Sequence, residues 1–300
     1  VIIGTTMGET QFIEEPLFDD DAQWLNDDHY RRIASGLPGC IARNVQADCR
    51  ASGGATDVYG ACAAGNMAIA MGRRALLEKQ CDLVIAGGSD GFSRLAFIGF
   101  MRLRLTAAEE CRPFDEKRDG LFVGEGATVF VLERASDAKA RGARVRARVA
   151  GCAITSESYH PTRPDPEGDG LKRALRGALS DAEMAPADID YVNAHGTGTA
   201  ANDAIEMKVM QECLPAGTPF SSTKALTGHT MGAAGAMEAA ACVLSLEHQT
   251  LIPTWHLTNV LQPCEMDALQ GAPRQAELRC AMNNSAGFGG YNSSVILAAP

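Results

Sequence analysis

The chain has 300 residues, of which 46% are hydrophobic and 21% charged, the balance of a globular protein with a sizeable core. Its formal net charge of −10 argues against nucleic acid or an anionic membrane surface as the main partner. No apolar run reaches transmembrane length, and the opening Val-Ile-Ile-Gly lacks the basic segment and cleavage site of a signal peptide. We therefore expect a cytoplasmic protein.

Short apolar runs alternate with alanine-rich helical stretches along the chain. The predicted strands are Val1–Gly4, Leu83–Ala86, Ala127–Leu132, Tyr191–Asn193, Phe220–Ser222 and Ser294–Leu297. The predicted helices are Ala63–Lys79, Asp169–Asp181, Ala201–Glu212 and Ala233–Glu247. This alternation predicts an α/β protein with helices packed on a sheet.

Two polar segments interrupt this pattern. The acidic, aromatic-bearing stretch from Glu14 to Arg32 is interpreted as an irregular surface excursion. The basic stretch from Arg134 to Arg148 separates two halves, so we place a boundary near residue 150.

The ten cysteines are scattered, and no C-x-x-C pair occurs. A chain of this length does not need disulfides, so most cysteines are expected to be small buried hydrophobic residues. His160, His248 and His256 show no metal-ligand spacing with cysteine, and neither a dinucleotide fingerprint nor a phosphate-binding loop is present.

Cys62 stands in Gly60-Ala-Cys62-Ala-Ala-Gly65, directly before a predicted helix. The unpaired N–H groups and dipole of a helix N-terminus favour a thiolate and can stabilise an oxyanion. The turn alone does not separate a nucleophile from a small buried cysteine, and both interpretations stay open at this point.

His195 ends a short predicted strand, where sites tend to form in open α/β sheets. A histidine that merely fixes a turn is the alternative. Thr197 and Thr199 alternate along an extended segment, so both hydroxyls could face one amide-bearing ligand. Asp203 and Glu206 share a face of the next predicted helix and are expected to orient water or a loop.

His229 precedes a Gly-Ala-Ala-Gly turn that leads into a helix. Lys224 lies five residues earlier, and Glu238 lies inside the alanine-rich helix. Buried lysine and glutamate need partners, which predicts a Lys224–Glu238 pair. A thiol nucleophile with two imidazoles indicates carbon–carbon chemistry on a thioester rather than hydrolysis.

Near the C-terminus, Asn283 to Asn292 is predicted as a glycine-dense turn before the last strand. It could supply a second oxyanion N–H, or it could be a tight hairpin connection.

In this order, the segments resemble the β-ketoacyl-acyl carrier protein synthases of the elongating type, which have the thiolase fold. The similarity runs through essentially the whole chain. It includes Leu83-Val-Ile-Ala-Gly-Gly-Ser89, Arg112-Pro-Phe-Asp115, Arg118-Asp-Gly120, Gly124-Glu-Gly126, Tyr159-His160, Asn193-Ala-His195-Gly-Thr197, Ser222-Thr-Lys224, Gly228-His229 and Gly287-Phe288-Gly-Gly290.

The resemblance implies a thiolase-like fold of two similar halves, each a mixed five-stranded sheet with helices packed in layers. Residues 1–150 would carry Cys62, and residues 151–300 would carry His195, Lys224 and His229. It also implies no cofactor beyond the phosphopantetheine arm of an acyl carrier protein, and no metal.

The resemblance also implies the roles of individual residues. Cys62 would accept the acyl chain, while His195 and His229 would bind the malonyl thioester, promote loss of CO₂ and stabilise the enolate. The N–H groups of Cys62 and Phe288 would form the oxyanion hole, with Phe288 also a gate. Lys224 would be held by Glu238. Thr197 and Thr199 would bind the pantetheine amides.

The sequence departs from the family pattern at two points. The family usually begins with a further strand and helices. This sequence lacks that segment, which is about a quarter of the expected length. Ala286 stands where the family typically has phenylalanine, which could widen the acyl pocket or loosen the gate.

The expected partners are an acyl carrier protein and a second ketosynthase-like chain, in a homodimer or a heterodimer. Arg112 matches a docking position of the family, and Arg31 and Arg32 are candidate companions. Two other functions stay open: a non-catalytic partner like a chain length factor, and a thiolase acting on coenzyme A thioesters. Retention of Cys62 with both histidines argues against the non-catalytic partner.

Overall fold

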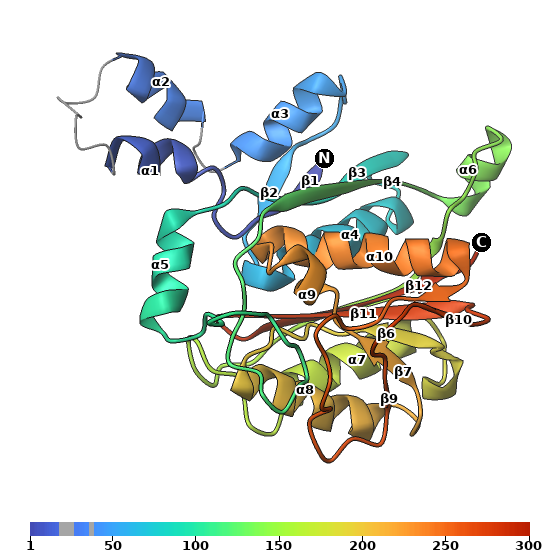
Figure 1. Ribbon diagram of the computed structural model, residues 1–300. Coiled ribbons are helices and arrows are strands. Elements are labelled where there is room, and N and C mark those ends of the chain that lie inside the picture. Colours follow the sequence, from blue (N-terminus) through green and yellow to red (C-terminus); the bar gives the residue numbers. More distant parts are fainter. Residues whose placement is uncertain (18–26, 36–38) are drawn as a thin grey trace.

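The protein is layered, with two helices between two sheets and two further helices outside the second sheet (Figure 1). This computed structural model describes residues 1–17, 27–35 and 39–300. Within these ranges no helix is long and apolar enough to cross a bilayer. The predicted α/β class is confirmed.

The first sheet has four strands in the order β2-β1-β3-β4, with β4 antiparallel to β3 and the other pairs parallel. Its strands are β1 (Ile2–Gly4), β2 (Thr56–Val58), β3 (Leu83–Asp90) and β4 (Gly126–Glu133). The carboxyl ends of β1, β2 and β3 therefore meet at one edge, where a site can form.

The second sheet has six strands in the order β5-β12-β11-β6-β7-β9. Its strands are β5 (Arg148–Ser156), β6 (Tyr191–Asn193), β7 (Pro219–Ser221), β9 (Asp267–Ala268), β11 (Cys280–Gly287) and β12 (Tyr291–Ala298). The short strands β8 (Thr250–Leu251) and β10 (Arg274–Gln275) form a separate pair. The expectation of five strands in each half is wrong for both sheets. The second sheet has a sixth strand, because the two-residue β9 pairs with β7. In the described part of the first sheet, only four strands pair.

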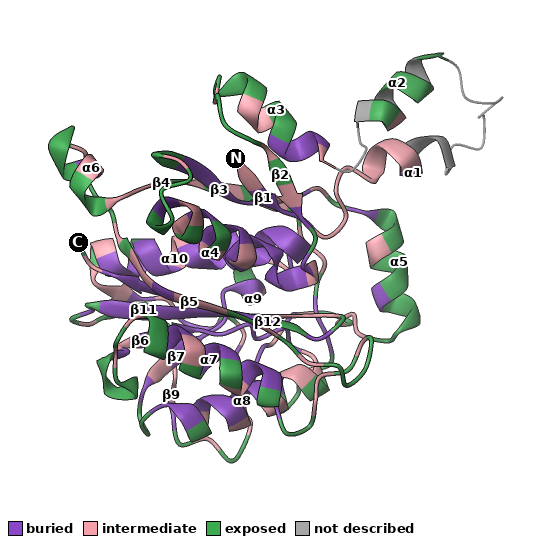
Figure 2. Cartoon of the chain, turned by 180° about the vertical axis from the view of Figure 1, so that it is seen from behind, coloured by how far each residue is buried: buried purple, intermediate pink, exposed green. Residues whose placement is uncertain are grey.

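The central layer consists of α4 (Ala64–Leu77) and α10 (Ala234–His248), which contact each other and both sheets. Small residues let their backbones approach closely. A Cβ placed on Gly65 would lie 2.6 Å from the Ala236 nitrogen, and one on Gly235 would lie 2.9 Å from the Asn66 nitrogen. Figure 2 shows buried residues concentrated in this layer and in the strands around it.

The remaining helices cover the outside. α7 (Asp169–Asp181) packs on β5 and β12, and α8 (Ala200–Cys213) packs on α7. The others are α1 (Gln11–Leu17), α2 (Asp27–Ser35), α3 (Cys40–Asp48), α5 (Arg94–Arg102), α6 (Ala135–Ala140) and α9 (Lys224–Thr227). Three 3₁₀ turns are η1 (Ala61–Ala63), η2 (Pro186–Asp188) and η3 (Met231–Ala233).

Two sequence-based predictions are corrected here. The segment from Glu14 to Arg32 is not irregular at its ends, which lie in α1 and α2; its middle falls outside the described residues. The predicted turn from Asn283 to Asn292 is mostly strand. Its polar side chains are buried, and several are hydrogen-bonded: the Ser294 hydroxyl donates to Asn284 Oδ1 at 2.9 Å, and the Asn283 amide donates to Asn66 Oδ1 at 2.9 Å. Polarity therefore did not mark a turn.

Candidate active site

Cys62 lies in the η1 turn at the start of α4, with 6% of its surface exposed. The preceding Ala61 has φ of 48°, a conformation that costs energy for any residue with a Cβ. The end of β11 packs against this turn: a Cβ on Gly287 would lie 3.0 Å from the Cys62 nitrogen. The Cys62 amide and the residues around Phe288 therefore come together, as an oxyanion hole requires.

Burial raises the pKa of the Cys62 thiol to about 12, and the nearby charge of Lys224 opposes this rise only in part. The sequence-based expectation of a lowered pKa at a helix N-terminus is therefore wrong for the free protein, because desolvation of the thiolate is the larger effect. The resting group is a thiol.

The two histidines of the sequence prediction lie side by side, with ring centroids 5.4 Å apart and the rings nearly perpendicular. His195 follows β6, and its backbone N–H donates to the Glu206 carboxylate at 2.6 Å. His229 follows α9, and its backbone N–H donates to the Phe122 carbonyl at 2.6 Å. Both rings are buried, so their positions are set by packing as well as by these bonds.

Each imidazole has its Nδ1 occupied as an acceptor. The Lys224 ammonium, which can only donate, lies 3.3 Å from His195 Nδ1, and the Met231 N–H donates to His229 Nδ1 at 3.3 Å. A neutral imidazole with Nδ1 accepting carries its proton on Nε2. Burial and the charge of Lys224 hold the pKa of both histidines well below their usual value. Both rings are therefore neutral Nε2–H donors near pH 7.

The predicted Lys224–Glu238 pair is present and almost fully buried. The Lys224 ammonium contacts one oxygen of Glu238 and donates to the His195 carbonyl at 2.6 Å. Burial raises the pKa of Glu238 to about 7, while Lys224 limits that rise. Its second carboxylate oxygen has no hydrogen-bond partner among the described residues.

The loop after His195 is held by two buried carboxylates. Asp203 accepts from the N–H groups of Thr197 and Gly198, and Glu206 accepts from the N–H of Gly196 at 2.8 Å. This confirms that Asp203 and Glu206 orient a loop. The hydroxyls of Thr197 and Thr199 lie 2.8 Å apart and face each other.

Phe288 packs against Phe100 of α5, with ring centroids 5.6 Å apart and the rings tilted by 40°, and joins an apolar cluster with Leu121 and Met231. Ala286 lies two residues earlier at the end of β11, opposite Asn292 of β12. The proposed gate therefore depends on α5, which was not predicted from the sequence. The N-terminus of α5 is capped by Glu14, whose carboxylate accepts from the Ser93 hydroxyl and the Arg94 N–H.

The structure gives the surroundings of two of the proposed docking arginines. Arg112 is bound to Glu110 through two hydrogen bonds of 3.0 and 2.8 Å. Arg31 is exposed on α2, and the side chain of Arg32 lies outside the described residues. Their docking role stays a prediction.

The remaining cysteines and the possible metal ligands were the other groups of interest in the sequence. All ten cysteines are free thiols, and six of them are buried, in line with the expectation for most of them. In the part of the chain that the structure describes, no cluster of three or more histidine, cysteine, aspartate or glutamate side chains could hold a metal ion.

Comparison with known proteins agrees with this geometry. Residues 1–138 match the family model of the β-ketoacyl synthase N-terminal domain, and residues 146–258 match that of the C-terminal domain. The 3-oxoacyl-[acyl-carrier-protein] synthase 2 of Mycobacterium tuberculosis is 34% identical over 304 residues, covering 98% of this chain and 73% of the relative.

Solved structures give the same result and confirm the thiolase-like fold. The ishigamide ketosynthase/chain length factor has a TM-score of 0.94 at 35% identity, covering 100% of this chain and 74% of that one. A type II polyketide ketosynthase in complex with its acyl-carrier protein and bound to the hexaketide has a TM-score of 0.92 at 28% identity, covering 100% and 78%. The chain belongs to the β-ketoacyl synthase family, the condensing acyltransferases of fatty-acid and polyketide synthesis.

Proposed function

We propose that this chain joins an acyl group held on Cys62 to a malonyl group held on an acyl carrier protein, with loss of CO₂. The observation that carries the proposal is the buried pair of neutral histidines, each with Nδ1 occupied and Nε2–H left as a donor. Two such donors suit the single thioester oxygen on which negative charge develops during decarboxylation.

In the first half-reaction, the Cys62 sulfur attacks the acyl thioester carbonyl. The new S–C bond replaces the bond to the pantetheine sulfur, and the thiol proton passes to that departing sulfur. A neutral thiol with a raised pKa fits this exchange, because no charge remains buried afterwards. The oxyanion formed on the way is stabilised by the N–H groups of Cys62 and Phe288.

In the second half-reaction, the malonyl C–CO₂ bond breaks, and its electron pair moves into an enolate whose oxygen accepts from His195 and His229. The enolate carbon then attacks the acyl carbonyl on Cys62. Collapse of this intermediate forms the 3-oxoacyl thioester and releases the Cys62 thiolate, which takes a proton from solvent. Lys224 fixes the His195 tautomer throughout.

The Thr197 and Thr199 hydroxyls would bind the amides of the pantetheine arm, and the carrier protein would supply that arm, so that no resident cofactor is required. Relatives in solved structures are described as complexes with an acyl-carrier protein or with a chain length factor. We propose the same two kinds of partner for this chain. Its cytoplasmic location and dimeric state stay predictions.

The two half-reactions can be separated by mutation. Cys62→Ala should abolish transfer of an acyl group from a carrier protein, measured by intact-protein mass spectrometry, and leave malonyl decarboxylation largely in place. His229→Ala should do the reverse. Cys280→Ala is the matched control, because Cys280 is 7% exposed against 6% for Cys62. Acylation of the Cys62→Ala protein at the wild-type level would overturn the nucleophile assignment.

A further inference from the structure

Asp90 is a buried carboxylate that the proposed reaction does not use. It ends β3 and is 2% exposed. Its two oxygens accept four hydrogen bonds: from the Thr5 hydroxyl at 2.6 Å, from the Thr6 and Met7 N–H groups at 2.8 and 3.0 Å, and from the Gly232 N–H at 2.6 Å. Asp90 therefore joins the loop after β1 in the first half to the η3 turn in the second half.

The η3 turn is directly connected to His229. Met231, the first residue of the turn, donates its N–H to His229 Nδ1. Met231 has φ of 51°, a strained conformation that persists only where its surroundings impose it. A shift of this turn would remove the hydrogen bond that fixes the His229 tautomer.

The surroundings that impose this conformation come from the first half. A Cβ on Gly232 would lie 2.4 Å from the Thr5 carbonyl carbon and 2.5 Å from the Thr6 nitrogen. The turn is thus clamped between the backbone after β1 and the Asp90 carboxylate. Among the described residues, Asp90 is the one side chain that accepts the Gly232 N–H.

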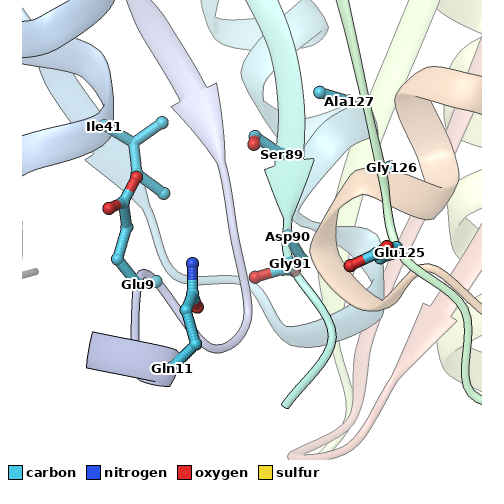
Figure 3. A pocket seen from close by; sticks show the side chains of 10 residues that line it. Glu9, Gln11, Ile41, Ser89, Asp90, Gly91, Glu125, Gly126 and Ala127 are labelled. Carbon is cyan, nitrogen blue, oxygen red and sulfur yellow. The ribbon is translucent and has the colours of Figure 1, made fainter. Parts of the chain in front are cut away.

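Asp90 also lies at the edge of a cavity. It forms part of the wall of a cavity of about 410 Å³ at the edge of the first sheet, together with Ser89, Gly91 and Glu125 (Figure 3). Charged carboxylates are rarely buried to this degree unless hydrogen-bonded, and all the recorded bonds of Asp90 go to the two loops that meet beside His229.

We propose that Asp90 is a positioning residue for His229: it holds the η3 turn so that the Met231 N–H keeps His229 Nδ1 as acceptor and Nε2–H as donor. This inference rests on the proposed function, in which His229 stabilises the enolate. It predicts that loss of Asp90 impairs decarboxylation more than acylation of Cys62, because Asp90 hydrogen-bonds the η3 turn and acts on Cys62 only through its charge, which helps to raise the pKa of that thiol.

The test measures the two half-reactions separately in Asp90→Asn. An amide offers one acceptor oxygen and presents an NH₂ group to the donors, so the turn loses part of its support. We expect malonyl decarboxylation to fall about tenfold, the scale of a small misplacement of a catalytic group, with Cys62 acylation within about twofold of the wild type. The control is Asp190→Asn, which changes a less buried carboxylate that accepts the N–H groups of Arg279 and Cys280 and, in the described part of the chain, makes no hydrogen bond to either histidine or to η3.

A milder variant keeps the test decisive if Asp90→Asn does not fold. Thr5→Val removes the hydroxyl that donates to Asp90 and leaves the carboxylate in place. We expect decarboxylation to fall about threefold, again with acylation nearly unchanged. Thermal unfolding and Cys62 acylation report whether each variant is folded.

The outcomes separate this inference from the proposed function. If His229→Ala decarboxylates malonyl thioester at the wild-type rate, the proposed function is wrong, whatever Asp90 does. If His229→Ala is inactive but Asp90→Asn and Thr5→Val reduce both half-reactions by the same factor, Asp90 supports the fold only and the inference is overturned. A selective loss of decarboxylation supports it.

Discussion

The turn that carries Cys62 and the turn that follows His229 have the same local structure. Each begins with a residue of positive φ, Ala61 at 48° and Met231 at 51°, and continues as a 3₁₀ turn into a central helix. They differ at the next position, where the first turn has Cys62 and the second has Gly232. The first leaves room for a side chain, whereas the second is packed against backbone, and its N–H binds Asp90.

This difference shows how two turns of the same conformation serve different purposes. In the first half, the turn presents Cys62, the proposed nucleophile, together with its amide. In the second half, the same turn presents no side chain of its own at that position and instead supports the adjacent histidine through a backbone N–H. The chemistry of the two halves is thus complementary although their framework is similar.

The largest expected effect comes from the second half. Lys224→Met leaves Glu238 buried without its partner, which should cost about 3 kcal/mol of unfolding free energy. It also frees His195 Nδ1, so decarboxylation should fall by about 100-fold or more. Chemical denaturation and a decarboxylation assay measure the two effects. The double variant with Glu238→Gln should recover stability but not activity; recovery of both would show that Lys224 acts on the fold alone.

Gly232→Ala tests whether the second turn truly lacks room for a side chain. The added Cβ would meet Thr5 backbone at 2.4 Å, so unfolding free energy should fall by about 2–3 kcal/mol. Gly99→Ala in α5 is the control, because a Cβ added at Gly99 would have no neighbouring atom within 4 Å. Helix propensity should raise the unfolding free energy of this variant by up to about 1 kcal/mol. Equal stability of the two variants would contradict the comparison of the turns.

The raised pKa of Cys62 makes a prediction about pH. Because the pKa lies at about 12, alkylation of Cys62 by iodoacetamide should rise roughly tenfold per pH unit between pH 7 and 9 without a plateau. Peptide mass spectrometry measures the rate. The folded state binds the proton more tightly than the unfolded chain, whose ordinary value is 9.0, so this group's contribution to stability is complete below pH 9 and is lost toward pH 12. A plateau near pH 7 would show that the helix N-terminus outweighs burial.

Ala286→Phe should have the smallest effect. The larger side chain, two residues before Phe288, should narrow the acyl pocket, so that transfer of long acyl chains to Cys62 slows several-fold, a difference of about 1 kcal/mol. Short chains should transfer at the wild-type rate. A panel of acyl carrier proteins loaded with chains of graded length measures the ratio. An unchanged ratio would place Ala286 outside the acyl pocket.

Much of the fold follows from the sequence where hydrophobic periodicity is strong. The helix Asp169–Asp181 was predicted with its observed bounds, because its apolar residues lie on one face. β11 was not predicted as a strand, because its Asn283, Asn284 and Ser285 are polar yet buried. Their hydrogen-bond partners include residues far away in the chain, such as Asn66. α5 was missed as well, because apolar residues are distributed around it.

The site shows the same division. Cys62 and both histidines are placed in glycine-rich turns at the ends of predicted elements, which is a local signal. Asp90 and Glu14 have no such signal, because their partners are N–H groups of residues about 80 or more positions away in the chain. Which backbone amide a carboxylate will meet depends on tertiary packing, and one sequence does not encode it as a pattern.

The small-residue contact between α4 and α10 has a mechanical consequence. Gly65 and Gly235 bring the two backbones together without intervening long side chains, so the separation between the start of α4 and the start of α10 cannot be altered by a change of rotamer. In the proposed reaction, the contact works as a fixed spacer between Cys62, which would hold the acyl chain, and the two histidines, which would stabilise the carbanion. If Phe288 is the gate that we propose, substrates of different length would be accommodated beside Phe288 and α5, while the distance between Cys62 and the histidines stays constant.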